Sequence, residues 1–273
     1  MLSSLDVFAR KASGLVREAS AFDAFLFAFM NIGAASSLWV VSSWGAYLYP
    51  SGDLLGGTVF AAILFLVGYA FVWGMLGGSM PRSGGSYIYS SRIVHPAVGV
   101  AISFGDVFVL LLYNGTLAPW TIDPGLTTWL SVMGAPEELT SILTSPTIMF
   151  ILVSLILVWT IFVIFGGMKT YLRVQKIIGI LALISLATTV MVYFTVTPDS
   201  FKAIWDARAA EYGSLTYLEM IEAAKNADPT LFAPIFSPLM GLMGLIVVNS
   251  WLYHYGFASC WVAGEVKRPQ RNV

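Results

Sequence analysis

Long apolar runs with few or no charges recur along the chain, and short polar or charged connections separate them. An α-helix needs roughly 20 residues to cross the hydrocarbon core of a bilayer, so each run is long enough to span it. The runs cover residues 24–50, 54–79, 97–118, 147–166, 177–197 and 238–263. The pattern predicts an all-α polytopic membrane protein with six transmembrane helices.

The middle of the first run is not built like a regular transmembrane helix. Between Asn31 and Ser37 it holds an amide, a glycine and two hydroxyls at a depth where leucines are expected. One interpretation is an interrupted helix that lines a protein cavity and presents free N–H groups and a positive helix end to an anionic ligand. The other is a face of small residues on which a second helix packs closely. The residues alone leave both interpretations open.

The connections carry expectations of their own. Residues 1–23 have apolar side chains at helical spacing, which predicts an N-terminal helix, either lying on the membrane surface or solvated. We expect a polar connection at 80–96, an external loop with a short helix at 113–146, a basic turn at 167–176 and a half-helical segment at 198–228. Close helix contacts in the second run are expected at Gly68, Gly74, Gly77 and Gly78.

Composition supports the membrane assignment and excludes several other classes. The chain is 58% hydrophobic and 11% charged, with a mean hydropathy of +0.80, whereas soluble domains are about 25% charged. The net charge of −1 and the lack of a basic run give no indication of a nucleic-acid partner. The single cysteine, Cys260, forms no internal disulfide, and His95 and His254 are too few for a histidine-rich metal site. We expect no cofactor, and we expect most aromatic residues in membrane belts and lipid-facing positions.

Lysine and arginine favour the cytoplasmic side of a membrane, so their positions predict the orientation. With a cytoplasmic N-terminus, only Lys202, Arg208 and Lys225 of the basic residues fall on the outer side. The sequence therefore predicts a multi-pass protein of the cell membrane with both termini in the cytoplasm.

Three segments together carry a resemblance to a known family. The first lies between Met80 and Gly99 and contains MPRSGGSY, SRI and HPAVG; the second is AGEVKRPQRN, from Ala263 to Asn272. The third is the small-residue break in the first run. They resemble the amino acid–polyamine–organocation (APC) transporter superfamily, in its signature loop between the second and third spans and in the cytoplasmic end of its sixth span.

The resemblance implies a five-plus-five inverted-repeat fold with a substrate site between interrupted first and sixth helices near the membrane midplane. The family has about ten core spans, so the resemblance implies a truncated chain, a split transporter with a second chain, or a half that self-associates. The implied parts are a cytoplasmic N-terminal helix (1–23), the first five-helix repeat (24–197), an extracellular loop with a short helix (198–235), and the sixth helix with its cytoplasmic end, which starts an incomplete second repeat (236–273).

The resemblance also implies how a substrate would be held. Backbone N–H groups at the first break would bind the substrate carboxylate, because they donate without adding a buried charge. Carbonyls at the second break would accept from the substrate ammonium, and Gly256 would tolerate unusual backbone angles there. The implied substrate-binding residues are Asn31, Ile32, Gly33, Ala34, Ala35, Ser36, Tyr253, His254, Gly256 and Phe257.

Four further polar residues have two interpretations each. Asp106 lies within the third run, where a charge costs about 2.5–3.5 kcal/mol on insertion scales, so it faces a cavity or a partner. It serves either in substrate binding and transport, with His254 as a candidate pair, or in a structural hydrogen bond. His254 is otherwise a hydrogen-bonded helix-packing residue. Arg82 and Arg92 either form an inner gate with cytoplasmic acids or anchor the chain on its positive side.

We therefore expect a secondary transporter of amino acids or related amines, not an enzyme. Its expected partners are membrane lipid, the amine or amino acid substrate, a coupling ion (H⁺ or Na⁺) and a second half-transporter chain, with no nucleic acid. The alternative is a non-transporting membrane subunit that pairs with a second polypeptide. A rhomboid-like serine protease is disfavoured, because Ser154, the serine of the fourth run, has no flanking glycines and no neighbouring histidine.

Overall fold

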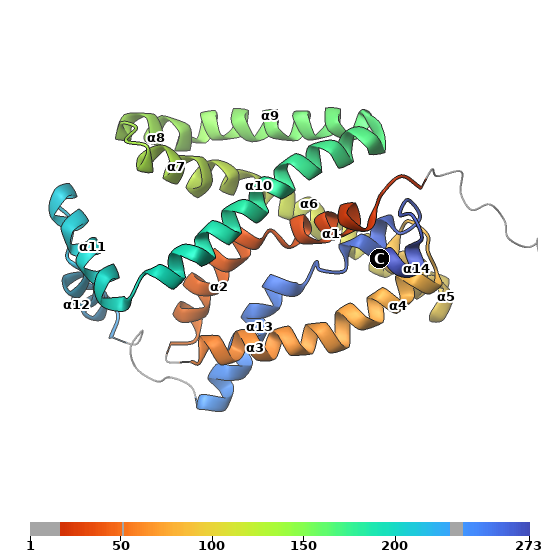
Figure 1. Ribbon diagram of the computed structural model, residues 1–273, viewed down its shortest axis with the longest axis horizontal. Helices are drawn as coiled ribbons and strands as arrows, with labels where there is room; N and C mark the ends of the chain where they lie inside the picture. Colours follow the sequence, from red (N-terminus) through yellow and green to blue (C-terminus); the bar gives the residue numbers. More distant parts are fainter. Residues whose placement is uncertain (1–16, 51, 230–236) are drawn as a thin grey trace, which may run out of the picture.

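The computed structural model describes residues 17–50, 52–229 and 237–273, and these residues form helices and no strand. Of the N-terminal helix predicted for residues 1–23, the part up to residue 16 lies outside the described residues; Arg17–Ser20 precede the first helix. The helices (Figure 1) are α1 (Ala21–Ile32), α2 (Ala34–Leu48), α3 (Leu54–Leu64), α4 (Phe71–Ser79), α5 (Gly85–Ile93), α6 (Pro96–Trp120), α7 (Thr127–Val132), α8 (Glu137–Thr144), α9 (Pro146–Phe165), α10 (Gly167–Thr195), α11 (Pro198–Tyr212), α12 (Tyr217–Ala227), α13 (Pro238–Tyr253) and α14 (Pro269–Asn272). Two π-helical segments, Phe65–Ala70 and Thr121–Leu126, join α3 to α4 and α6 to α7.

Five helical stretches among the described residues are long and apolar enough to cross a membrane, as an all-α membrane protein requires. They are Ala21–Leu48, Leu54–Ser79, Pro96–Val132, Pro146–Phe165 and Gly167–Thr195. The sixth predicted span is not one continuous helix. Its helix α13 has 16 residues and ends at Tyr253, and a 3₁₀ turn, Ala258–Val262, follows after a gap. At 1.5 Å per residue, α13 reaches only about 24 Å.

The connections contain more helix than the sequence pattern predicts. The expected polar connection at 80–96 includes α5, and the expected basic turn at 167–176 is the start of α10. The third helix continues to Trp120, past the expected loop start at Tyr113, with Pro119 inside it. Transmembrane helices tolerate proline where neighbouring groups satisfy the freed backbone, so proline is a weaker stop signal here than in a soluble protein.

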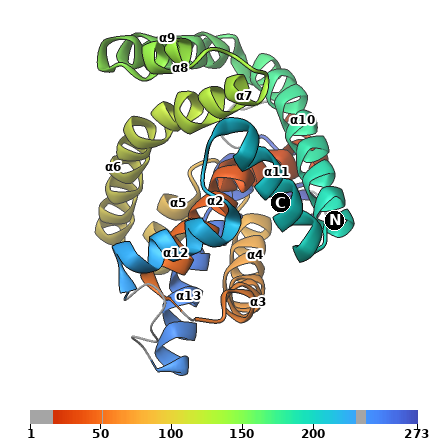
Figure 2. The same ribbon diagram turned by 90° about the vertical axis from the view of Figure 1, so that its left-hand side faces the viewer.

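Close packing joins α13 to α3 and α2, where glycines let the helices approach (Figures 1 and 2). A Cβ atom placed on Gly57 would lie 2.6 Å from the Cβ of Leu245, and one placed on Gly244 would overlap the ring of Tyr49. Leu245 and Asn249 are fully buried in this contact. The Thr58 hydroxyl donates to Asn249 Oδ1 over 2.7 Å and so links α3 to α13 by a buried polar contact.

The expected glycine contacts in the second run are half right. A Cβ on Gly77 would lie 2.7 Å from Val273, and one on Gly78 would lie 3.6 Å from Gln270. Nothing lies within 4 Å of a Cβ on Gly68 or Gly74, so the prediction is wrong for those two. Gly68 and Gly74 occur where the helix side is open, and composition alone does not indicate which side another helix covers.

The start of α1 and the C-terminal segment lie together at one end of the molecule (Figure 1). The N–H of Ala19 donates to the carbonyl of Glu265 over 3.0 Å, and the N–H of Lys267 donates back to the carbonyl of Ala19 over 2.8 Å. The same end holds the loop before α5, because the N–H of Gly84 donates to the carbonyl of Trp261 over 3.0 Å. Helices α11 and α12 lie at the opposite end in Figure 1.

Asp23 organises the junction of α1 with α10 at this end. Its carboxylate accepts from the N–H of Ser20 over 2.9 Å, and the Ser20 hydroxyl caps the N–H of Asp23, a reciprocal capping box that stabilises a helix start by about 1 kcal/mol. The same carboxylate pairs with the Lys176 ammonium of α10 over 2.9 Å. The Gln175 side chain donates to the Asp23 carbonyl over 3.2 Å, so two polar contacts, from Lys176 and Gln175, fix α1 against α10.

Candidate functional site

The first transmembrane stretch is interrupted at the glycine that the sequence indicated. Helix α1 ends at Ile32, Gly33 adopts a left-handed conformation with φ of 61° and ψ of 59°, and α2 begins at Ala34. Only glycine adopts this conformation without a penalty from its own Cβ. A Cβ on Gly33 would also lie 2.9 Å from the hydroxyl of Ser36. The structure shows the interruption that the first interpretation requires, and the ligand-binding part of that interpretation stays a prediction.

At this break, side-chain donors satisfy the carbonyl groups of Ile32 and Gly33, whereas no side chain caps the first N–H groups of α2. The Ser36 hydroxyl donates to the Gly33 carbonyl over 2.8 Å, and the Ser37 hydroxyl donates to the Ile32 carbonyl over 2.6 Å. The Asn31 side chain donates back to the Phe27 carbonyl over 2.7 Å. No side chain caps α2 at Gly33, and the first N–H groups of a helix have no intrahelical acceptor. The N-terminus of α2 therefore offers N–H donors and positive potential.

A second break follows α13. The helix ends at Tyr253, and the chain then turns, with the N–H of Gly256 donating to the carbonyl of Tyr253 over 3.0 Å and that of Ala258 donating to Tyr255 over 3.0 Å. Gly256 does not have a positive φ, so the expectation that it adopts an unusual backbone angle is wrong. A Cβ there would lie 3.2 Å from the Tyr253 carbonyl oxygen, so tight spacing, not the left-handed region, favours glycine at this turn.

The two breaks lie against each other. A Cβ on Gly256 would come within 3.8 Å of the Cδ1 atom of Ile32, the last residue of α1. Helix α1 also packs on the 3₁₀ turn that follows the second break. Ile32 and Gly33 are half-buried and Gly256 is exposed, so the place where the breaks meet is partly accessible.

An aromatic cluster surrounds the second break. The ring of Phe257 stacks on Trp73 with centroids 4.2 Å apart and meets Tyr69 edge-on at 5.2 Å. Tyr255 contacts Tyr113 of α6 at 5.9 Å. Sequence reasoning assigned such residues to membrane belts and so missed Tyr69 and Trp73 as neighbours of the break. Their spacing of four residues, which places both on one face of a helix, was the available signal.

Asp106 lies beside this aromatic cluster. Its carboxylate accepts a short hydrogen bond from the hydroxyl of Ser86, which is buried in α5. Tyr69, His254 and Tyr255 lie within electrostatic range of this carboxylate. His254 stacks on Tyr69 with centroids 6.2 Å apart. Among the described residues no hydrogen bond joins Asp106 to His254, and the hydrogen-bond partner of Asp106 is Ser86.

Arg82 precedes α5 and Arg92 lies in the last turn of that helix. Both side chains are exposed, and neither forms an ion pair with another described residue. Arg82 lies in the loop that approaches Gly264, near the C-terminal segment. The structure therefore holds no closed gate through these arginines within residues 17–50, 52–229 and 237–273.

Comparison with known proteins gives no independent assignment. No protein-family model, curated protein or solved structure matches this chain. The described residues also hold no group of three or more His, Cys, Asp or Glu side chains that could bind a metal ion. The groups that determine what the site can bind are the N–H donors of α2, the turn after α13, the aromatic side chains around that turn and the carboxylate of Asp106.

Proposed function

We propose that this chain is the N-terminal half of a secondary transporter for amino acids or related amines. The observation that carries the proposal is the contact between the two helix breaks, at Ile32 and Gly256. Interrupted helices that meet within a membrane protein are the arrangement by which many transporters hold a small solute near the bilayer midplane. The resemblance to the APC superfamily in segments 80–99 and 263–272 supports the same function.

In this proposal the substrate carboxylate binds at the N-terminus of α2. The first break directs uncapped N–H groups of Ala34, Ala35 and Ser36 toward the ligand, and the helix end adds positive potential. Because Ser36 and Ser37 already donate their hydroxyls to carbonyls of the break, those carbonyls do not repel a bound anion as strongly.

The substrate ammonium binds on the side of the second break. Carbonyls of the turn from Tyr253 to Phe257 accept from it, and the aromatic faces of Tyr69 and Tyr255 attract a cation. The carboxylate of Asp106 acts on the same aromatic residues and supplies a negative charge nearby. An α-amino acid carries its ammonium and carboxylate groups on the same carbon atom, so the short distance between the breaks fits this substrate class better than a long diacid or diamine.

The orientation follows from the basic end of the molecule. Four segments meet there: the start of α1, the loop before α5, the start of α10 and the C-terminal segment. The positive-inside rule favours the cytoplasmic side of the cell membrane for this end. The solute-binding groups lie on this chain, and further spans, on a longer chain or on a second polypeptide, complete the transport pathway and supply the coupling to H⁺ or Na⁺.

A binding experiment on the full chain tests the proposal. The purified chain is titrated with radiolabelled amino acids, with amines that lack the carboxylate, and with carboxylates that lack the amine. Saturable binding of at least one amino acid, weakened by removal of either charged group, is expected. Absence of saturable binding for the whole panel contradicts the proposal, and recovery of a second multi-spanning polypeptide without solute binding favours the alternative of a non-transporting subunit.

A further inference from the structure

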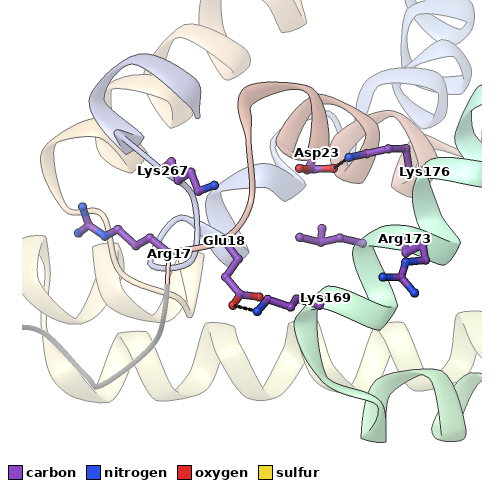
Figure 3. A pocket seen from close by; sticks show the side chains of 8 residues that line it. Arg17, Glu18, Asp23, Lys169, Arg173, Lys176 and Lys267 are labelled. Atoms are coloured by element: carbon purple, nitrogen blue, oxygen red, sulfur yellow. Dashed lines mark ion pairs between the residues drawn. The ribbon is translucent and has the colours of Figure 1, made fainter.

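A basic cavity of about 490 Å³ lies at the end of the molecule where α1, α10 and the C-terminal segment meet (Figure 3). Its size is in the range of small-molecule binding sites. Two carboxylates, Glu18 and Asp23, line it together with more than twice as many cations. The cations are Arg17, Lys169, Arg173, Lys176 and Lys267.

Two of the five cations are neutralised by carboxylates within the cavity. Lys169 pairs with Glu18 over 3.2 Å, and Lys176 pairs with Asp23 over 2.9 Å. The remaining three, Arg17, Arg173 and Lys267, are exposed and form no ion pair with any described residue.

Figure 3 shows how the three unpaired cations lie around the hollow. Lys267 extends from the C-terminal segment into the space between that segment and α10. Arg17 and Arg173 stand on opposite sides of the hollow, and the guanidinium group of Arg17 is directed away from the other side chains. Exposed arginine and lysine side chains that form no ion pair with a described residue reorient easily. The cavity therefore has positive charge in excess of what holds α1 against α10.

The cavity lies at the border between apolar and polar segments. Lys169, Arg173 and Lys176 follow one another at intervals of four and three residues, which puts them on one face of α10. Residues 177–195 of the same helix carry no charge, and α1 and α2 carry none after Asp23. The cations thus mark the depth at which two transmembrane helices enter the apolar core, which is where lipid phosphates lie.

We propose that this cavity binds a phosphate-bearing anion at the membrane surface, either the headgroup of an anionic phospholipid or a soluble phosphate ester. Guanidinium and ammonium groups bind phosphate oxygens with strong charge-assisted hydrogen bonds. Basic pockets between transmembrane helices on the cytoplasmic side are suited to anionic headgroups. The site is distinct from the two helix breaks, and it stands whether or not the chain carries a solute.

Native mass spectrometry of the full chain in detergent tests the proposal. The chain is titrated with phosphatidylglycerol, with zwitterionic phosphatidylcholine as the uncharged comparison, and in a second arm with soluble glycerol phosphate. The variant Arg17→Gln/Arg173→Gln/Lys267→Gln removes the three unpaired cations. The matched variant Lys202→Gln/Arg208→Gln/Lys225→Gln removes the same charge from α11 and α12, at the opposite end.

The expected result is that phosphatidylglycerol binds in preference to phosphatidylcholine. The cavity variant should bind it roughly a hundredfold more weakly, from a factor of about five for each cation. The α11–α12 variant should bind as the unsubstituted chain does. Displacement of the lipid by glycerol phosphate, or binding of glycerol phosphate alone, would identify a soluble phosphate ester as the ligand; lipid binding without displacement would identify the headgroup.

Three results would overturn the proposal. The first is equal binding of phosphatidylglycerol and phosphatidylcholine to the original chain, together with no binding of glycerol phosphate. The second is an equal loss of binding in both triple variants, because the effect would then come from net charge. The third concerns the charge-retaining variant Arg17→Lys/Arg173→Lys, which is used if circular dichroism shows that the cavity variant does not fold. This variant should bind phosphatidylglycerol within about threefold of the original chain. Weaker binding by the folded charge-retaining variant contradicts the site.

Discussion

The Cδ1 atom of Ile32 lies 3.8 Å from the position that a Cβ on Gly256 would occupy. This contact joins the last residue of α1 to the turn after α13, two places where a membrane-embedded helix loses its regular hydrogen bonds. Unsatisfied backbone groups are costly in a membrane, so two breaks in contact indicate a place where protein, water or ligand satisfies them.

Replacing Gly33 by alanine should straighten or strain the first break. The left-handed conformation costs an L-residue about 1–2 kcal/mol, and the new Cβ would crowd the Ser36 hydroxyl. We expect Gly33→Ala to lower the thermal unfolding temperature and to weaken amino acid binding at least tenfold. Gly105→Ala on α6 is the matched control, because nothing lies within 4 Å of a Cβ there. Unchanged binding in folded Gly33→Ala would show that the break is not needed for the solute.

Gly57→Ala and Gly68→Ala should change stability in opposite directions. A Cβ on Gly57 would lie 2.6 Å from that of Leu245, and overpacking of this kind costs about 1–3 kcal/mol. A Cβ on Gly68 meets nothing within 4 Å, and alanine in a helix interior is more stable than glycine by about 0.5–1 kcal/mol. Thermal unfolding of the purified variants in one detergent measures both. Because the clash is with the Cβ atom of Leu245, Gly57→Ala should cost less in a Leu245→Gly background than in the original chain; an equal cost in both backgrounds would show that the crowding is not with Leu245.

The sequence was informative where the signal is local. A glycine with flanking hydroxyls inside an apolar run marked the first break, because polar and flexible residues are costly in a regular transmembrane helix unless they are used. The second break was expected only from the family resemblance. Asp53 and Pro146, at the ends of polar connections, placed the starts of α3 and α9 within a residue or two.

What could not be predicted depends on contacts between distant segments. Ser86 as the donor to Asp106, and Thr58 as the donor to Asn249, come from pairs of helices whose relative rotation no single run of sequence specifies. The same applies to Gly68, which has the composition of a packing residue and no neighbour. Tyr69 and Trp73 were assigned to lipid-facing positions, because an aromatic side chain has the same hydropathy at a membrane belt and in a protein cluster.

The hydrogen bond between Thr58 and Asn249 should couple α3 to α13. Thr58→Val removes the hydroxyl at nearly constant shape, Asn249→Leu removes the acceptor, and a double-mutant cycle isolates their interaction. Polar pairs between transmembrane helices contribute about 0.6 kcal/mol on average and at most about 1.7 kcal/mol, so we expect a coupling in this range. Thr160→Val on α9 is the control, because its hydroxyl bonds only to the Ile156 carbonyl of its own helix. Additive effects of the two substitutions in chemical or thermal unfolding would exclude the link.

Glu265 should make stability depend on pH at the end where α1 and the C-terminal segment meet. Burial, reinforced by the nearby Glu18 carboxylate, raises the pKa of Glu265 above its ordinary value of 4.5, although the neighbouring Ser83 hydroxyl opposes the shift. The folded chain therefore holds the Glu265 proton more tightly than the unfolded chain. This contribution to stability is fully present below the ordinary pKa, and it is lost as the pH rises through the raised pKa.

Glu265→Gln removes this dependence, because glutamine keeps the shape of the side chain without its charge. The unfolding temperature of the variant, relative to the original chain, should rise as the pH increases from about 4 to 7 and then level off. Glu219→Gln provides a contrast of opposite sign, since hydrogen bonds from the Thr216 hydroxyl and N–H lower the pKa of Glu219. The stability of the original chain relative to that variant should rise as the pH increases through the lowered pKa to the ordinary value of 4.5, and should level off above it. A difference between Glu265→Gln and the original chain that stays constant with pH would mean that Glu265 keeps the same pKa in the folded and unfolded chain, and that its burial against the loop before α5 carries no electrostatic cost.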